Sequence, residues 1–365
     1  MLLPLIRQFK VKYQSPIVTW RRFVELFIGT FAIGLLLVFA FVLLIDPYDD
    51  VPFSLPLKRH LIDANQRFMY PQVVRSGLFD SLVIGTSTSK LLDPVILNEE
   101  FGARFANLSM DAATAWEQMT IAKYFFDHAG KPKVIIIGVD SQWQWCASDA
   151  DTQRITARGF PYFLYDDDKW NDFFFLFNSR TVEMAGKLVG VHLGLYSERS
   201  RFDGYYLFVP PENAYDLEKA RNAIWGGRPR TLPDPTKKPF EMSDEQRASL
   251  VYPSLNLLDD LLLKAGDALK IIGLMPAHVA NQPDPATLAG AREAECKSRI
   301  TQIARQRGAK VIDWQYSSPL TREDSNYWDS IHYRVPVANS LAHAIGSAIR
   351  EGKPSADGTY RLLVQ

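Results

Sequence analysis

The sequence predicts an α/β protein whose doubly wound, mainly parallel sheet of five strands carries a large aromatic-rich insertion and follows one transmembrane helix. Three observations lead to this prediction. A long apolar segment lies near the N-terminus, short runs rich in β-branched residues recur after it, and helical patterns stand between those runs. Strands that alternate with helices are typical of parallel sheets with helices on both faces.

The composition fits a large folded body and excludes several classes of protein. The chain has 365 residues, enough for one large or two modest domains at about 150 residues each. Lys plus Arg equal Asp plus Glu at 41 each, so no net charge steers the protein toward nucleic acid. An apolar content of 47% excludes global disorder.

The cysteines and histidines predict no metal site and no cofactor. Cys146 and Cys296 can form at most one disulfide and cannot make a cysteine-rich zinc site. The six histidines lack metal-ligand spacing. The sequence alone leaves open whether the two cysteines pair.

Residues 23–45 (FVELFIGTFAIGLLLVFAFVLLI) carry one charge, Glu25, and predict the transmembrane helix. About 20 apolar residues cross the hydrocarbon core of a bilayer. The segment runs directly into Asp46 and Pro47 without a small-residue cleavage site, so we expect an uncleaved anchor. A buried core helix is the alternative.

Charges on either side of this segment predict its orientation. Residues 1–22 contain five basic residues and no acid, whereas Asp46, Asp49 and Asp50 follow the segment. The positive-inside rule assigns residues 1–22 to the cytosol and the main domain to the periplasm or the cell exterior. No later apolar run is long enough to span, so we expect a single-pass protein of the cytoplasmic membrane.

Five short apolar runs predict the strands of a domain over residues 81–350, after a linker over residues 46–80 and before a tail over residues 351–365. The runs are residues 81–85 (SLVIG), 104–108, 133–139 (KVIIIGV), 269–275 (LKIIGLM) and 310–313 (KVID). Helical spacing occupies residues 115–129, 254–268, 285–307 and 335–349.

Residues 147–249 interrupt this alternation and predict an insertion or lid. They have no clean periodicity, but the aromatic cluster at residues 160–177 makes them too apolar to stay unfolded. Three roles are open to these rings: stacking on sugars, resting on a membrane surface, or packing within the insertion.

Polar residues that follow the predicted strands are the candidate site residues, because the carboxyl ends of parallel strands carry the sites of such sheets. Ser87 follows the first strand and can act as a nucleophile near helix-terminal N–H groups. Asp329 and His332 stand three residues apart, so the carboxylate can orient an imidazole that addresses the serine. The ordinary alternatives are a helix-capping serine and a surface turn.

Three further residues are candidates for oxyanion stabilisation or substrate binding. Asn107 and Ser109 follow the second strand, and His278 follows the fourth. A hydrogen-bonded loop residue is the alternative for His278.

At these residues the sequence resembles the SGNH (GDSL-like) hydrolase and acyltransferase superfamily. Gly85, Thr86 and Ser87 match its first block, glycine-x-serine, and Asp329 with His332 matches its last block, aspartate-x-x-histidine. The resemblance implies a flavodoxin-like sheet with Ser87 as nucleophile, His332 as general base and Asp329 as its orienter.

With its anchor, the chain is similar to SGNH proteins that act with a membrane-bound O-acyltransferase on cell-envelope polymers. This similarity implies an esterase or O-acyltransferase acting on acyl esters of an envelope polysaccharide or glycolipid. The sequence departs from the superfamily at residues 107–113, which lack the glycine of the second block, and at residues 138–142, which lack the third. The alternative is therefore a non-catalytic scaffold or a glycan-binding partner of such an acyltransferase.

Overall fold

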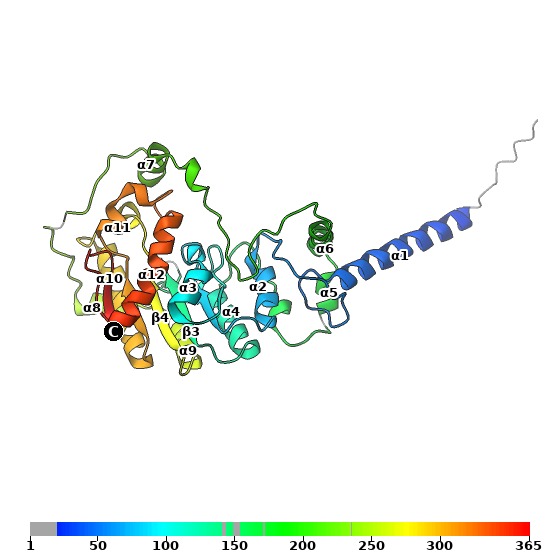
Figure 1. Ribbon diagram of the computed structural model, residues 1–365, viewed down its shortest axis with the longest axis horizontal. Coiled ribbons are helices and arrows are strands. Elements are labelled where there is room, and N and C mark those ends of the chain that lie inside the picture. Colours follow the sequence, from blue (N-terminus) through cyan, green and yellow to red (C-terminus); the bar gives the residue numbers. More distant parts are fainter. Residues whose placement is uncertain (1–19, 141–143, 149–153, 171, 235) are drawn as a thin grey trace, which may run out of the picture.

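The computed structural model describes residues 20–140, 144–148, 154–170, 172–234 and 236–365 (Figure 1). Its centre is one six-stranded sheet in the order β2-β1-β3-β4-β5-β6. The strands are β1 (Ser81–Ile84), β2 (Phe105–Asn107), β3 (Val134–Val139), β4 (Leu269–Leu274), β5 (Lys310–Asp313) and β6 (Arg361–Val364). The first five are parallel, which confirms the predicted α/β class and the mostly parallel sheet.

The sheet has six strands where the sequence predicts five. The additional strand, β6, lies in the predicted tail and pairs antiparallel with β5. The guanidinium of Arg361 donates to Asp313 Oδ2 on β5 at 2.9 and 2.8 Å. A half-buried edge strand of four residues has no distinctive apolar pattern, so only its pairing with β5 identifies it.

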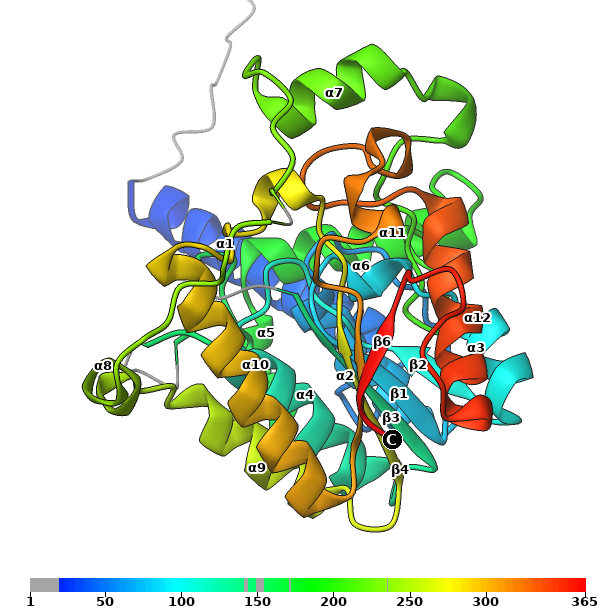
Figure 2. The ribbon, with the colours of Figure 1, turned by 90° about the vertical axis from the view of Figure 1, so that its left-hand side faces the viewer.

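Helices cover both faces of the sheet, as Figure 2 shows. One face carries α4 (Ala115–His128), α9 (Ser254–Lys264) and α10 (Leu288–Arg307), and the other carries α3 (Pro94–Phe101) and α12 (Val335–Glu351). Side chains alternate along each strand, so Leu82 and Ile84 enter the first apolar core and Val83 enters the second. Burial on both faces explains why β1 and β3 are mostly apolar and carry no charged side chain.

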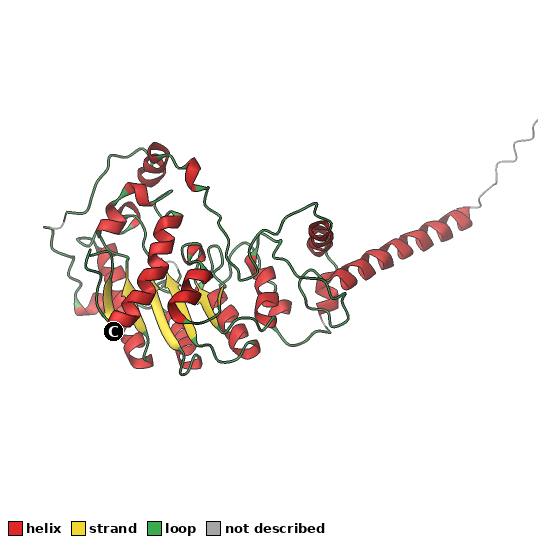
Figure 3. Cartoon of the chain, viewed as in Figure 1, coloured by secondary structure: helices red, strands yellow, loops and turns green. Residues whose placement is uncertain are grey.

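The remaining elements are short and lie around this central unit (Figure 3). The α-helices are α2 (Gln66–Arg75), α5 (Asp172–Leu176), α6 (Ser179–His192), α7 (Leu217–Trp225), α8 (Asp244–Ser249) and α11 (Pro319–Arg322). The 3₁₀ turns are η1 (Ser89–Leu91), η2 (Tyr162–Tyr165), η3 (Glu212–Ala214), η4 (Val279–Asn281) and η5 (Asp324–Asn326).

The predicted linker contains a buried helix. In α2, the side chain of Arg67 is fully buried and donates to both carboxylate oxygens of Glu117 in α4, at 2.9 and 2.7 Å. The sequence alone gives no sign that this arginine is buried, because its partner is 50 residues away.

The helix α1 (Trp20–Ile45) projects from the rest of the structure and is long and apolar enough to cross a membrane (Figure 1). Most of its side chains are exposed, but Val42 and Ile45 near its C-terminal end are buried. The side of α1 near this end packs against α5 and α6. The helix is therefore attached to the folded body by packing as well as by the chain.

Cys146 and Cys296 form a disulfide, which answers the question that the sequence leaves open. The bond joins the segment after β3 to α10, across 150 residues of chain. Cys296 is fully buried, so the crosslink is part of the core on that face of the sheet.

We expect the double variant Cys146→Ala with Cys296→Ala to have a free energy of unfolding lower by about 2–5 kcal/mol, because the crosslink restricts the unfolded chain. It should therefore unfold at a lower urea concentration. Urea denaturation of the full chain in detergent, followed by circular dichroism, measures the change. A reductant should lower the midpoint of the wild type and leave that of the double variant unchanged. Equal midpoints for the two proteins under oxidising conditions would contradict this prediction.

Candidate active site

Ser87 lies where β1 passes into η1, in a turn that two glycines make possible. A Cβ on Gly85 would lie 2.9 Å from the carbonyl oxygen of Gly138 and would collide with Ser89 Oγ. A Cβ on Gly138 would collide with the same hydroxyl. The absence of side chains at both positions lets Ser89 pack between the strand ends and leaves Ser87 half-buried.

The structure brings Ser87, His332 and Asp329 together in one hydrogen-bonded chain. Ser87 Oγ lies 2.9 Å from His332 Nε2, although the two residues are 245 positions apart. His332 Nδ1 lies 2.8 Å from Asp329 Oδ2. Asp329 Oδ1 also accepts the backbone N–H groups of Ile331 and His332, both at 2.7 Å, which holds the carboxylate in its turn.

These contacts define the protonation that the site favours. Burial raises the pKa of Asp329, but the hydrogen bond and charge of His332, with two backbone N–H donors, lower it, and the net pKa is below the usual value. An ionised Asp329 accepts the Nδ1–H of His332, so Nε2 is free to accept the hydroxyl hydrogen of Ser87. This is the geometry of a serine activated by an oriented base.

The insertion contributes a ring to this site. Phe208 packs edge-to-face on the imidazole of His332, with ring centroids 5.2 Å apart. The nearby Gly204 reaches so close to β2 that a Cβ there would collide with the Asn107 carbonyl oxygen. Sequence reasoning missed Phe208 because the insertion has no periodic pattern that would place it.

Asp140, at the end of β3, holds the turn that carries Ser87. Its Oδ2 accepts the hydroxyl of Thr86 and, at 3.0 Å, that of Thr88. Burial raises the pKa of Asp140 and the two threonines lower it, with a net increase. The signal that could have found this residue is a lone acid directly after a buried strand.

The amide of Asn107 is committed to the backbone and is not directed at Ser87. Its Nδ2 donates to the carbonyls of Ser89 and Leu92, both at 2.9 Å, and its Oδ1 accepts the N–H of Ser109. Ser109 is fully buried, and its carbonyl accepts the hydroxyl of Tyr70 at 2.9 Å. In this structure Asn107 therefore joins β2 to the turn after β1, and Ser109 bonds to α2.

The backbone N–H of Ser87 donates to no acceptor among the described residues. It remains available for an oxygen bound beside the serine hydroxyl. A backbone N–H at the nucleophile is the usual first donor of an oxyanion site.

His278 is a buried structural residue in this arrangement. Its Nε2 donates to Asp324 at 3.1 Å, and its Nδ1 accepts the N–H of Ala280 at 3.1 Å. Burial lowers its pKa despite Asp324, so the ring is held neutral. Its backbone N–H donates to the Ser330 carbonyl at 3.0 Å, which braces the turn between Asp329 and His332.

A buried lysine lies beside the site. Lys90 Nζ is 2.5 Å from Asp111 and stands over the rings of Tyr206 and Phe208, 4.9 and 5.0 Å from their centroids. Burial lowers the pKa of Lys90, and Asp111 opposes that shift. Phe208 thus contacts both this ion pair and the imidazole of His332.

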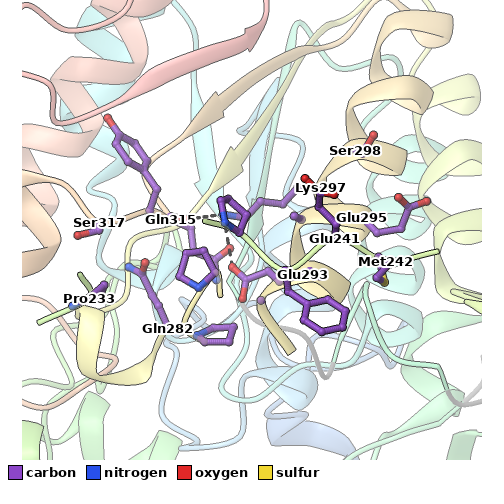
Figure 4. Close-up of a pocket in the computed structure, with 18 of the residues that line it drawn as sticks. Pro233, Glu241, Met242, Gln282, Glu293, Glu295, Lys297, Ser298, Gln315 and Ser317 are labelled. Carbon is purple, nitrogen blue, oxygen red and sulfur yellow. Dashed lines mark hydrogen bonds and ion pairs between the residues drawn. The ribbon is translucent and has the colours of Figure 1, made fainter. Parts of the chain in front are cut away.

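The described residues contain no group of three or more His, Cys, Asp or Glu side chains that could hold a metal ion. A pocket of about 510 Å³ lies near the carboxyl end of β5, lined in part by Lys297 and Gln315 (Figure 4). Gln315 Nε2 donates to the Asp140 carbonyl at 2.9 Å, but the pocket lining includes none of Ser87, Asp329 and His332.

Comparison with known proteins gives no family for this chain. No protein-family model matches it. No curated protein sequence gives a significant match.

We expect the free energy of unfolding of the wild type to fall relative to that of Asp140→Asn as pH rises from about pH 4. A carboxyl whose folded pKa is raised binds more protons in the folded state, so its contribution falls as pH rises above the unfolded value. The amide that Asp140→Asn introduces does not titrate and cannot lose that contribution. Urea denaturation across the pH range measures the difference.

The matched control for this comparison is Asp127→Asn, which removes an exposed carboxylate of α4. Its pH profile should run parallel to that of the wild type. Parallel profiles for the wild type and Asp140→Asn would contradict the prediction.

Proposed function

We propose that the protein is a membrane-anchored serine esterase or O-acyltransferase of the SGNH type. The observation that carries the proposal is the hydrogen-bonded chain from Ser87 through His332 to Asp329, with distances of 2.9 and 2.8 Å. Three residues from opposite ends of the domain meet in the order that nucleophilic acyl transfer needs.

In the proposed reaction, Ser87 Oγ attacks the acyl carbonyl carbon and His332 Nε2 takes the hydroxyl proton. Asp329 stabilises the imidazolium, and the Ser87 N–H faces the oxyanion. His332 then gives the proton to the departing alcohol oxygen, which leaves an ester on Ser87. Water or a sugar hydroxyl attacks that ester while His332 takes its proton, and Ser87 recovers its hydrogen as the acid or new ester departs.

The sheet supports the SGNH assignment through its strand order. The order β2-β1-β3-β4-β5, with helices on both faces, matches the strand order 2-1-3-4-5 of flavodoxin-like sheets and so supports a doubly wound fold. In such sheets ligands bind beyond the carboxyl ends of the strands, where the order reverses. Ser87 after β1 and Asp140 after β3 stand on either side of that point.

Two features support a location of the main domain outside the cytosol. The apolar helix α1 follows a basic segment and precedes acidic residues, and Cys146 is bonded to Cys296. Structural disulfides persist mainly in oxidising compartments. We therefore propose an envelope polysaccharide or glycolipid ester as substrate, and a membrane-bound O-acyltransferase as a partner.

A non-catalytic scaffold with the same fold is the second candidate. The observation that favours it is the Asn107 amide, which spends both hydrogens on backbone carbonyls. Loss of one oxyanion donor costs about a hundredfold to a thousandfold in rate. The two candidates differ in whether Ser87 is reactive.

We expect a fluorophosphonate probe to label the full chain in detergent at Ser87, because His332 can accept the proton as the serine displaces fluoride. Ser87→Ala and His332→Ala should abolish labelling. In-gel fluorescence and peptide mass spectrometry measure it.

Ser340→Ala, which removes an exposed hydroxyl of α12, is the matched control and should label like the wild type. Labelling that survives in Ser87→Ala would rule out Ser87 as the activated serine. Folded wild type without labelling would favour the scaffold.

We expect Asp329→Asn to slow labelling by roughly 10²–10⁴-fold while leaving the protein folded, because an amide neither orients the Nδ1–H nor stabilises the imidazolium. The rate constant of probe incorporation measures the effect, with Asp127→Asn as the exposed-carboxylate control. A rate close to that of the wild type would show that Asp329 does not position the base.

A further inference from the structure

A cluster of aromatic rings stands exposed near the C-terminal end of α1. We call it the aromatic collar, and its exposed members are Phe53, Trp170, Phe174, Phe175 and Phe177. Phe174 is 86% exposed and Trp170 is 79% exposed. Exposed apolar patches on folded proteins mark sites of contact with a partner, a ligand or a membrane.

The collar is continuous with α1. Phe177 meets Phe39 of α1 edge-to-face, with ring centroids 5.5 Å apart. Phe53 stacks on Phe173 at 5.7 Å, and Trp170 lies 5.8 Å from the same ring. Phe53 belongs to the loop after α1 and Trp170 precedes α5, while Phe173 is part of α5, which itself packs on α1.

The length of α1 places the collar at one end of the apolar span. A helix crosses the hydrocarbon core in about 20 residues, and α1 has 26. A span of about 20 residues that starts at Phe23, after the two arginines, ends about one helical turn past Phe39, which is the residue that contacts the collar. Beyond it, Val42 and Ile45 are already buried in the folded body.

Two basic side chains beside the collar are paired toward the body. Lys169, next to Trp170, forms an ion pair with the buried Asp50. Arg180, at the start of α6, donates to both carboxylate oxygens of Asp63 at 2.8 and 2.6 Å and covers the ring of Phe68. Lys169 and Arg180 are therefore directed inward, whereas the carboxylates of residues 166–168, just before Trp170, are exposed beside the rings.

We propose that the aromatic collar inserts into the interface of the bilayer that α1 spans, so that lipid covers its exposed rings. Trp favours that depth, where one side is apolar and the other is wet, and Phe with Trp forms the buried face of helices that lie in this interface. The occupant is lipid because the collar continues the surface of α1, which lipid must surround if α1 spans. This inference does not depend on Ser87 chemistry.

Insertion of the collar would give the main domain a second contact with the membrane. A body joined to α1 by a flexible linker would sample many orientations, but α5 and α6 pack directly on α1. The collar and α1 together would hold the body at one height and orientation above the lipid. An acyl ester on a lipid-linked or surface polymer would then meet the site in a restricted geometry.

The test uses single added cysteines in the full chain, because Cys146 and Cys296 are bonded to each other. Phe174→Cys carries an environment-sensitive fluorophore, and the protein is reconstituted in vesicles of phosphatidylethanolamine and phosphatidylglycerol. Lipids with a nitroxide near the headgroup quench a label at that depth. We expect blue-shifted emission and strong quenching at position 174.

Two labels serve as controls. Leu36→Cys, on the exposed surface of α1, is read with lipids that carry the nitroxide on the acyl chain and reports whether the helix lies in lipid. Ser340→Cys, on α12, reports water. Quenching at positions 36 and 174 but not at 340 supports the proposal. Quenching at 36 with water-like, unquenched emission at 174 overturns it, and so does the absence of quenching at both.

Failure of this proposal and failure of the proposed function are distinguishable. Because Phe174 is exposed, Phe174→Cys should fold and should keep the fluorophosphonate reactivity of the wild type. Lost reactivity in the wild type would refute the esterase and leave the lipid contact intact.

Discussion

The close approach of β1 to β3 is the constraint on which the candidate site depends. Gly85 and Gly138 have no side chain where the strand ends meet, and Ser89 fills the space between them. The chain can then turn sharply from β1 into η1, which leaves Ser87 half-buried at the carboxyl end of β1. Any side chain at either glycine would collide with Ser89 and displace that turn.

Buried polar contacts join this turn to the loops that surround it. Asp140, directly after β3, accepts hydrogen bonds from the hydroxyls of Thr86 and Thr88. The hydroxyl of Tyr333, next to His332 in the chain, donates to the Thr88 carbonyl. Asn107 joins it to β2 through the Ser89 carbonyl. Burying any of these polar groups without a hydrogen-bond partner would cost free energy. The contacts therefore favour the loop arrangement in which every group is paired.

The segments outside the sheet divide into two groups by what they touch. Residues of the insertion near Phe208 pack on the imidazole of His332 and cover Lys90. The α5 and α6 region of the same insertion packs instead on α1, with its rings exposed. One long insertion therefore contacts both the candidate site and the helix that is apolar enough to cross a membrane.

The features that the sequence by itself determined are those that depend on neighbouring residues. The apolar run of α1, the β-branched runs of the five parallel strands, and the turn in which Asp329 accepts the Ile331 and His332 N–H groups all follow from local composition and spacing. The tertiary structure decided the rest. It assigned β6 to the sheet edge and buried Arg67 against Glu117. It also used the Asn107 amide for backbone carbonyls and brought Phe208 onto His332. In each case the contacting residue lies far away in sequence or on another element. The contact therefore depends on tertiary packing, which no local sequence pattern encodes.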